Sequence, residues 1–188
     1  MISHKLKFIF IHIPKTSGNS LSLFLNKYID NKVITITNKL GKNQGIVIKS
    51  EFENINIKHK KINYYHDTYG KKINDYYKFS IVRNPYDRIL SYYFWAKGMK
   101  NKNFIRDEFK KFIILNKSIL YQNKYVDKSV NIIYFENLIN ELKNIELFKN
   151  IVNFDNYPMV NKSNNSTLDW RDVYDKELKD LVYKLFKK

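Results

Sequence analysis

The sequence of 188 residues contains no cysteine. A disulfide framework, a thiolate zinc site and a cysteine nucleophile are therefore all excluded. The four histidines do not have the spacing of metal ligands, so a metal site is not expected. Repeats and long linkers are also missing from the sequence, and this favours one domain over residues 1–188.

The sequence shows no targeting segment. Its first apolar run begins within a few residues of Met1, which leaves no room for a signal peptide or a membrane anchor. We therefore expect a cytoplasmic protein, either of a cell or of a virus-infected host.

Acidic residues are scarce, with 18 Asp and Glu against 34 Lys and Arg, giving a formal net charge of +16. Such a charge suggests a polyanionic partner or substrate. Lys, Asn, Ile and Tyr are all over-used together, however, as an AT-rich genome would produce. Basicity alone therefore does not establish nucleic-acid binding. With 44% hydrophobic and 16% aromatic residues, the chain can build a substantial core.

Apolar runs that predict strands alternate with segments of helical spacing. The predicted strands are 6–13, 33–37, 45–49, 77–82 and 130–135, with a turn at 39–44. The predicted helices are 20–28, 60–75 with a break near Gly70, 86–97, 137–149 and 176–186. This alternation predicts an α/β fold with a central parallel sheet covered on both faces, and a ligand site at the carboxyl ends of its strands.

The first turn lies in "IHIPKTSGNSL", residues 11–21, where a buried strand passes through a polar, glycine-containing turn into a helix. Such a turn directs backbone N–H groups and the positive end of the helix dipole at one spot, which suits a phosphate or sulfate. The nucleoside-triphosphate loop G-x-x-x-x-G-K-[ST] differs, because here Lys15 precedes Gly18 and Ile13 stands where the first glycine would be. A Walker-type ATPase is therefore disfavoured.

The second turn lies in "FSIVRNPYDRILSYY", residues 79–93. Arg83 ends the predicted strand, and Ser91 follows about two turns into the next helix. An arginine fork and a hydroxyl both suit a phosphate. Taken alone, the segment is equally open to a structural explanation, in which Arg83 or Arg88 pairs with Asp87 or another carboxylate.

Together the two turns resemble the cofactor motifs of the sulfotransferases that use 3′-phosphoadenosine 5′-phosphosulfate (PAPS). "PKTSGNS" is similar to the family's 5′-phosphosulfate loop, P-K-T-[AG]-G-[ST]-[ST], and "VRNPYDRILSYY" is similar to its 3′-phosphate motif. The nearest branch is that of the carbohydrate O-sulfotransferases of the heparan 2-O and chondroitin type and their bacterial relatives. The resemblance continues through "IIYFENL" and "VNKSNNSTLDWRDVYDKELKDLVYKLF", and so spans nearly the whole chain.

This resemblance implies a P-loop-like three-layer α/β/α fold, PAPS as the donor and no metal. It implies that Lys15 neutralises charge as the phosphate leaves, and that Arg83 and Ser91 hold the 3′-phosphate. Lys162 is a further candidate for the 3′-phosphate. The implied 5′-phosphate loop consists of Pro14, Lys15, Thr16, Ser17, Gly18, Asn19 and Ser20, with Asn19 in place of the usual Ser or Thr.

An acceptor hydroxyl needs a general base, and histidine suits that role. Relatives carry "KH" ahead of the helix that precedes the second motif, and "IKHKKINYYHDTYG" offers His59 and His66. His59 follows a lysine and has nearly the family's spacing, so it is preferred. Glu51 ranks third, and His12 is expected to pack against the loop or orient it.

The implied acceptor is a hydroxyl, most simply that of a carbohydrate, with specificity in loops such as 39–58 and 98–128. Two other functions stay open at this point. A P-loop-like nucleotide kinase would need Glu136 or Asp155 as its magnesium carboxylate. A non-catalytic basic protein would bind nucleic acid or glycan through lysine and aromatic side chains.

Overall fold

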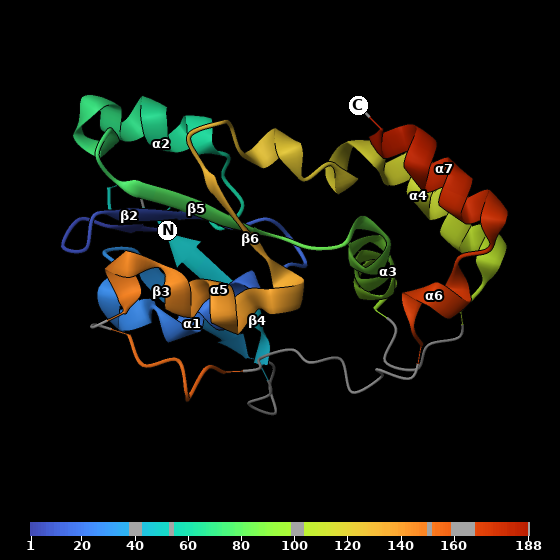
Figure 1. Cartoon of the computed structure of the whole chain (residues 1–188), viewed down its shortest axis with the longest axis horizontal. Coiled ribbons are helices and arrows are strands. Elements are labelled where there is room, and N and C mark those ends of the chain that lie inside the picture. Colours follow the sequence, from blue (N-terminus) through green and yellow to red (C-terminus); the bar gives the residue numbers. More distant parts are fainter. Residues whose placement is uncertain (38–42, 53–54, 99–103, 150–151, 159–167, 188) are drawn as a thin grey trace. The chain divides into compact units, whose positions relative to one another are not determined.

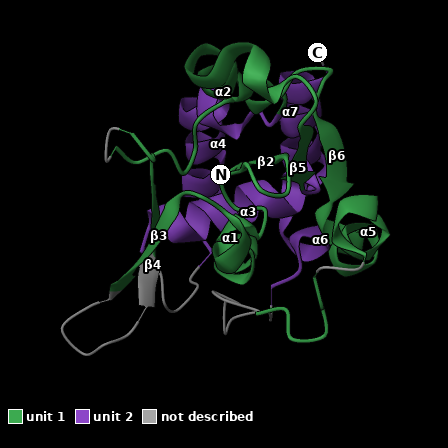
Figure 2. Cartoon of the chain, turned by 90° about the vertical axis from the view of Figure 1, so that its left-hand side faces the viewer, with its two compact units in different colours: residues 1–82, 123–161 green, residues 83–122, 162–188 purple. Residues whose placement is uncertain are grey.

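The computed structural model describes residues 1–37, 43–52, 55–98, 104–149, 152–158 and 168–187 (Figure 1). The chain forms two compact units. Unit 1 comprises residues 1–82 and 123–161, and unit 2 comprises residues 83–122 and 162–188 (Figure 2). Within the described ranges, no helix combines the length and the apolar character needed to cross a lipid bilayer.

Unit 1 is built on a four-stranded sheet in the order β1-β2-β5-β6. Its strands are β1 (Ile2–Ser3), β2 (Phe8–Ile11), β5 (Tyr77–Val82) and β6 (Asn131–Tyr134). β5 pairs in parallel with both β2 and β6, whereas β1 is an antiparallel edge strand. Every residue of β2 is buried, which explains why this strand is a continuous apolar run in the sequence.

Helices cover both faces of this sheet. Phe8, Phe10 and Phe79 belong to one core cluster, together with residues of α1 (Gly18–Phe24) and α5 (Leu138–Asn144). Ile9 and Ile11 belong to another cluster, with residues of α2 (Ile62–Tyr69). Figure 1 accordingly shows α2 on one side of the strands and α1 and α5 on the other. The prediction of a mixed α/β fold with a central, mostly parallel sheet and helices is confirmed.

The remaining elements of unit 1 are a separate pair of strands and several short 3-10 turns. β3 (Lys32–Thr37) and β4 (Asn43–Lys49) form a separate antiparallel pair. The 3-10 turns of unit 1 are η1 (Asn26–Tyr28), η2 (Gly70–Ile73), η3 (Asn123–Tyr125), η4 (Phe135–Asn137) and η5 (Glu146–Phe148).

Unit 2 is helical and has its own core. Its helices are α3 (Pro85–Ala96), α4 (Arg106–Leu120), α6 (Trp170–Val173) and α7 (Lys176–Phe186). The buried residues of this unit include Ile89, Tyr93, Phe109, Ile113, Tyr174 and Leu178. The fully buried Arg88 of α3 donates a hydrogen bond from Nη1 to the carbonyl oxygen of Leu120 (2.7 Å), which ties α3 to the end of α4.

The strand 77–82 and the final helix 176–186 have the predicted bounds. The first helix begins at Gly18 and ends at Phe24, earlier at both ends than expected, and α5 is shorter than the predicted helix 137–149. The expectation that 98–128 is a loop is wrong, because α4 occupies its middle and buries Phe109, Ile113 and Leu120 at helical spacing. Most of the predicted turn 39–44 lies outside the described residues.

Candidate active site

The loop between β2 and α1 has a strained backbone. Lys15 and Ser17, on either side of Thr16, adopt φ values of 67° and 68°, which non-glycine residues seldom do. Each such residue costs about 1–2 kcal/mol. Left-handed residues that alternate with other conformations form the backbone concavities that bind anions. Backbone strain of this kind is concentrated at ligand sites, so this loop is a candidate ligand site.

Hydrogen bonds within the loop maintain this conformation. Thr16 Oγ1 donates to the carbonyl oxygen of Ile13 (2.9 Å), and Ser22 Oγ donates to that of Gly18 (2.6 Å). Thr16 is fully buried, and the one hydrogen of its hydroxyl is used in the bond to Ile13, so this hydroxyl cannot also donate to a phosphate. Ser17 Oγ lies 3.4 Å from the hydroxyl of Tyr157. Burial raises the pKa of Tyr157 to about 12, so this phenol is uncharged at neutral pH.

His12 lies beneath the start of α1. Its ring is 3% exposed and stacks on Phe10, with 5.8 Å between the ring centroids. A Cβ atom at position 18 would lie 2.0 Å from His12 Cδ2 and 2.1 Å from His12 Nε2. Glycine is therefore required at position 18 because the imidazole ring occupies the space of a side chain.

His59 lies next to His12. Its Nδ1 is 3.0 Å from the carbonyl oxygen of His12, and the two rings meet edge to face with 4.6 Å between centroids. A carbonyl oxygen can only accept a hydrogen bond, so this contact requires a proton on His59 Nδ1. In the neutral ring, the lone pair is then on Nε2. The structure thus brings His59 to the end of β2 where the loop begins.

His66 and Glu51 lie toward the other end of the parallel strands from His59. His66 Nε2 is 3.6 Å from Asp127, which precedes the start of β6. Glu51 accepts a hydrogen bond from the hydroxyl of Tyr69 (2.6 Å) and lies 3.3 Å from His4. His4 in turn contacts Tyr76 just before β5, with 2.8 Å from Nδ1 to the hydroxyl. The two alternative bases are therefore placed near the amino ends of the parallel strands.

The electrostatics around His12 favour its neutral form. Burial, and next the nearby His59 and Lys58, hold the pKa of His12 well below 6.5. Burial also lowers the pKa of Lys58, whose Nζ donates to the carbonyl oxygen of Ile46 (2.9 Å). His12 Nδ1 is buried and has no hydrogen-bond partner among the described residues. An imidazolium at this position would therefore be strongly disfavoured.

Arg83 and Ser91 belong to unit 2. Asn84 caps α3 by accepting a hydrogen bond from Tyr86 N (3.0 Å), and Pro85 occupies the first helical position. The backbone of Arg83 exchanges hydrogen bonds with the side chain of Gln122, at 3.0 Å from its N–H and 2.8 Å to its carbonyl oxygen. The second motif is thus anchored at Arg83, directly after β5.

The Arg83 guanidinium pairs with Asp87, whose Oδ2 is 2.8 Å from Nε and 2.6 Å from Nη2. The carboxylate pairing that the sequence left open is thus present. Asp87 and the half-buried Ser91 are four residues apart in α3, so they lie along one ridge of the helix, whereas Arg83 stands just before the helix. Lys162 lies outside the described residues.

Residues 1–177 match a family model described as the sulfotransferase family, and the match includes both turns. The chain belongs to the sulfotransferase family. This membership makes it an enzyme of the transferase class. No curated protein and no solved structure gave a significant match to the chain.

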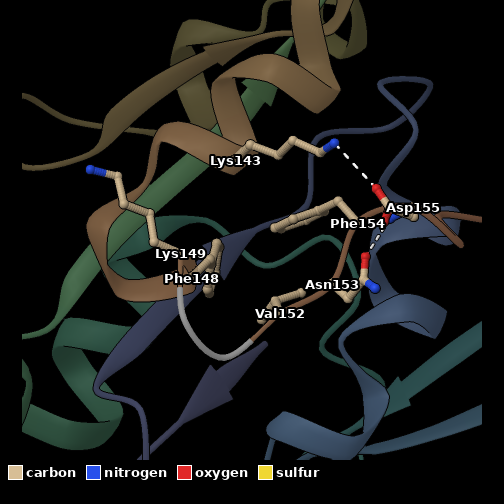
Figure 3. Close-up of a pocket in the computed structure, with 7 residues that line it drawn as sticks. All are labelled: Lys143, Phe148, Lys149, Val152, Asn153, Phe154 and Asp155. Atoms are coloured by element: carbon tan, nitrogen blue, oxygen red, sulfur yellow. Dashed lines mark hydrogen bonds and ion pairs between the residues drawn. The ribbon is translucent and has the colours of Figure 1, made fainter.

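A pocket of about 480 Å³ lies elsewhere in unit 1, and none of the predicted site residues of this sulfotransferase lines it. Figure 3 shows Lys143 reaching toward Asp155, 3.4 Å away, whereas the Lys149 side chain extends away from them. The lining residues are Lys143, Phe148, Lys149, Val152, Asn153, Phe154 and Asp155. Asp155, a magnesium ligand in the kinase alternative, thus has a lysine partner.

Two residues that support the motifs had no signal in the sequence. Gln122 is 39 positions from Arg83, and Tyr157 is 140 positions from Ser17. Neither stands in a recognisable motif, so only the fold could identify them.

The depressed pKa of His12 predicts an acid-sensitive fold. The unfolded chain takes up a proton near pH 6.5, whereas the folded chain does not, so the His12 contribution is complete above pH 6.5 and is lost as the pH falls below it. We expect His12→Gln to flatten the pH dependence of the free energy of unfolding there, by up to about 1.4 kcal/mol per pH unit. Urea denaturation between pH 5 and 8 measures this difference. Equal slopes for wild type and variant, or an NMR titration of His12 near pH 6.5 in the folded protein, would contradict the assignment.

Proposed function

We propose that this protein transfers the sulfuryl group of PAPS to a hydroxyl of an acceptor, with His59 as the general base. The observation that carries the proposal is the placement of His59 beside His12, at the start of the strained 5′-phosphosulfate loop, within a chain of the sulfotransferase family. The family generally uses this donor. The 5′-phosphosulfate of PAPS corresponds to the first motif, and its 3′-phosphate corresponds to the second.

The first motif suits the 5′ end of the donor. The left-handed conformations of Lys15 and Ser17 produce the type of backbone concavity that binds a phosphate, and they agree with the expectation from the motif. Thr16 contributes its N–H alone, because its hydroxyl is bonded to Ile13. The Lys15 ammonium stabilises the negative charge that grows on the leaving phosphate.

The second motif suits the 3′-phosphate. Arg83 offers a guanidinium whose orientation is already fixed by Asp87, and Ser91 offers a hydroxyl about one helical turn beyond Asp87. This pair would discriminate PAPS from donors without a 3′-phosphate. The P-loop-like character of the fold is part of this proposal.

PAPS supplies a sulfuryl group already activated by its bond to phosphate. The acceptor oxygen forms the new bond to sulfur as the bond to the 5′-phosphate breaks. His59 Nε2 takes the hydroxyl proton, because Nδ1 already carries a proton bonded to the His12 carbonyl oxygen. The protein's main task is to align the two reactants.

The acceptor class we propose is a carbohydrate hydroxyl, on the strength of the resemblance to the carbohydrate O-sulfotransferases. The excess of 34 basic over 18 acidic residues is compatible with an anionic acceptor. Release of 3′-phosphoadenosine 5′-phosphate (PAP) from PAPS, measured with a panel of mono- and oligosaccharides, tests this class directly.

If Arg83 and Ser91 bind the 3′-phosphate, PAP should raise the Tm far more than AMP does. Arg83→Ala should remove most of this difference and weaken PAP binding roughly 10- to 100-fold, the value of a charged hydrogen-bonded contact. Arg171→Ala is the matched control, because Arg171 pairs with Asp169 and lies over Trp170. Equal shifts with PAP and AMP in the wild type would remove PAPS as the donor.

Lys15→Ala should lower kcat by about 10²–10³-fold, as expected when a group that stabilises developing charge is lost. The circular dichroism spectrum should be unchanged, since the half-buried Lys15 is not part of a core cluster. Lys27→Ala serves as the control, because the Lys27 ammonium lies over the ring of Tyr28. Near-normal turnover of Lys15→Ala would show that another cation stabilises the leaving phosphate.

We expect different phenotypes from alanine substitutions at His59 and His66. His59→Ala should lose about 10²–10⁴-fold in kcat and keep its affinity for PAP, because a general base acts on the acceptor. His66→Ala should change neither, since His66 pairs with Asp127 near the amino ends of the strands. Steady-state kinetics and isothermal titration with PAP measure both quantities. An exchange of the two phenotypes would assign the base to α2, and loss in neither variant would make Glu51 the next candidate.

A further inference from the structure

We propose that His12 is the positioning residue of this active site. Its carbonyl oxygen fixes the orientation and the tautomer of His59, and its ring is the spacer between His59 and the donor loop. This inference rests on the proposed function, because it assigns a task relative to the base and the donor named there.

The first step concerns the base. The 3.0 Å contact from His59 Nδ1 to the His12 carbonyl oxygen leaves one neutral tautomer, with the proton on Nδ1. His59 is an exposed residue, and this contact gives its ring a fixed partner in the backbone of His12. The edge-to-face contact with the His12 ring, at 4.6 Å between centroids, limits the rotation of the His59 ring a second time.

The second step concerns the loop. The His12 ring packs so closely against Gly18 that a methyl group there would lie 2.0 to 2.6 Å from three ring atoms. Gly18 is the first residue of α1 and directly follows Ser17, one of the two left-handed residues. The same ring therefore contacts the base through one side and the beginning of the helix through another.

The third step concerns the charge of the spacer. A ring that has no hydrogen-bond partner for Nδ1 among the described residues, and that lies near Lys58 and His59, stays neutral. Because the buried His12 ring stays neutral and does not take up a proton, His59 is the histidine that accepts the proton in this site. His12 itself is buried, which distinguishes its role from that of a second base.

The tautomer is tested first, because its measurement does not depend on activity. Nitrogen-15 NMR of the wild type at pH 8 should show His59 with a protonated Nδ1 and an unprotonated Nε2. His12→Ala keeps the backbone carbonyl that fixes the tautomer and removes only the ring, so His59 should stay protonated on Nδ1 in this variant. A wild-type His59 protonated on Nε2 would overturn the proposal.

Kinetics then test the spacer. His12→Ala should lower kcat about 10²-fold, the effect of a misplacement near 1 Å, with a PAP dissociation constant within threefold of the wild type. The acidic limb of the kcat–pH profile should persist in His12→Ala and vanish in His59→Ala. His12→Phe restores a flat ring and should recover part of kcat; it also serves if His12→Ala folds poorly. Unchanged kcat in His12→Ala, or collapse of its PAP affinity, would overturn the spacer role.

A double-mutant cycle separates this role from general support of the fold. If His12 acts through His59, the variant with both changed to alanine should be no slower than His59→Ala alone, whereas independent roles would give multiplied losses and overturn the proposal. Failure of the proposed function would look different, because the wild type would then neither bind PAP nor release it from PAPS. The tautomer measurement would still decide the His12–His59 contact.

Discussion

The close packing of the His12 ring against the backbone of Gly18 is the constraint on which the arrangement of the site in unit 1 depends. An imidazole this near to a Cα atom requires glycine at position 18, and α1 begins there. The ring has Phe10 on one side, so the core of the sheet holds it in place. Because protein interiors are as dense as organic crystals, such a ring has little space into which it can move.

This packing is one of several contacts that together keep the strained loop in place. Two left-handed residues without glycine would relax in an isolated peptide. Here the loop starts from a fully buried strand and ends at a helix fixed by His12, and the Thr16–Ile13 bond closes it internally. The surrounding contacts over-determine the conformation, which is the condition under which strain survives at functional sites.

The direction of the parallel strands places the two candidate histidines near opposite ends of the strands, which agrees with the preference for His59 that its spacing gave. His59 and His66 are seven residues apart and both precede β5, so their spacing to the second motif is similar. α2 carries the chain back across the sheet between them, and this places His59 beside the end of β2 and His66 beside Asp127. A parallel sheet presents its ligand site at the carboxyl ends of the strands. Of the two histidines, His59 therefore lies at the end of the sheet where a ligand is expected.

Local patterns were predictable where one segment determines its own structure. The run 77–82, the Asn84 cap with Pro85, and the amphipathic helix 176–186 need only neighbours in the chain. Features that depend on distant partners were not predictable. β1 has two residues and exists because β2 lies beside it, Gln122 holds Arg83 across 39 positions, and α4 was hidden by its many exposed residues, including Ile114 and Leu115. For the site, the motifs indicated residue types and left the Arg83–Asp87 pair open as one alternative, whereas the His12–His59 contact required the fold.

The order of the strands has a consequence for synthesis on the ribosome. β5 is the central strand between β2 and β6, but the chain builds α3 and α4 of unit 2 before it reaches β6. At about 5–20 residues per second, β5 therefore waits several seconds for its second neighbour. During that time one edge of a strongly apolar strand has unpaired backbone groups, a hazard for pairing with other chains. Lys78, near the start of β5, has its ammonium bound to the carbonyl oxygens of Ile73, Asn74 and Tyr76, all made before β6, so nascent chains can fix this end of the strand early.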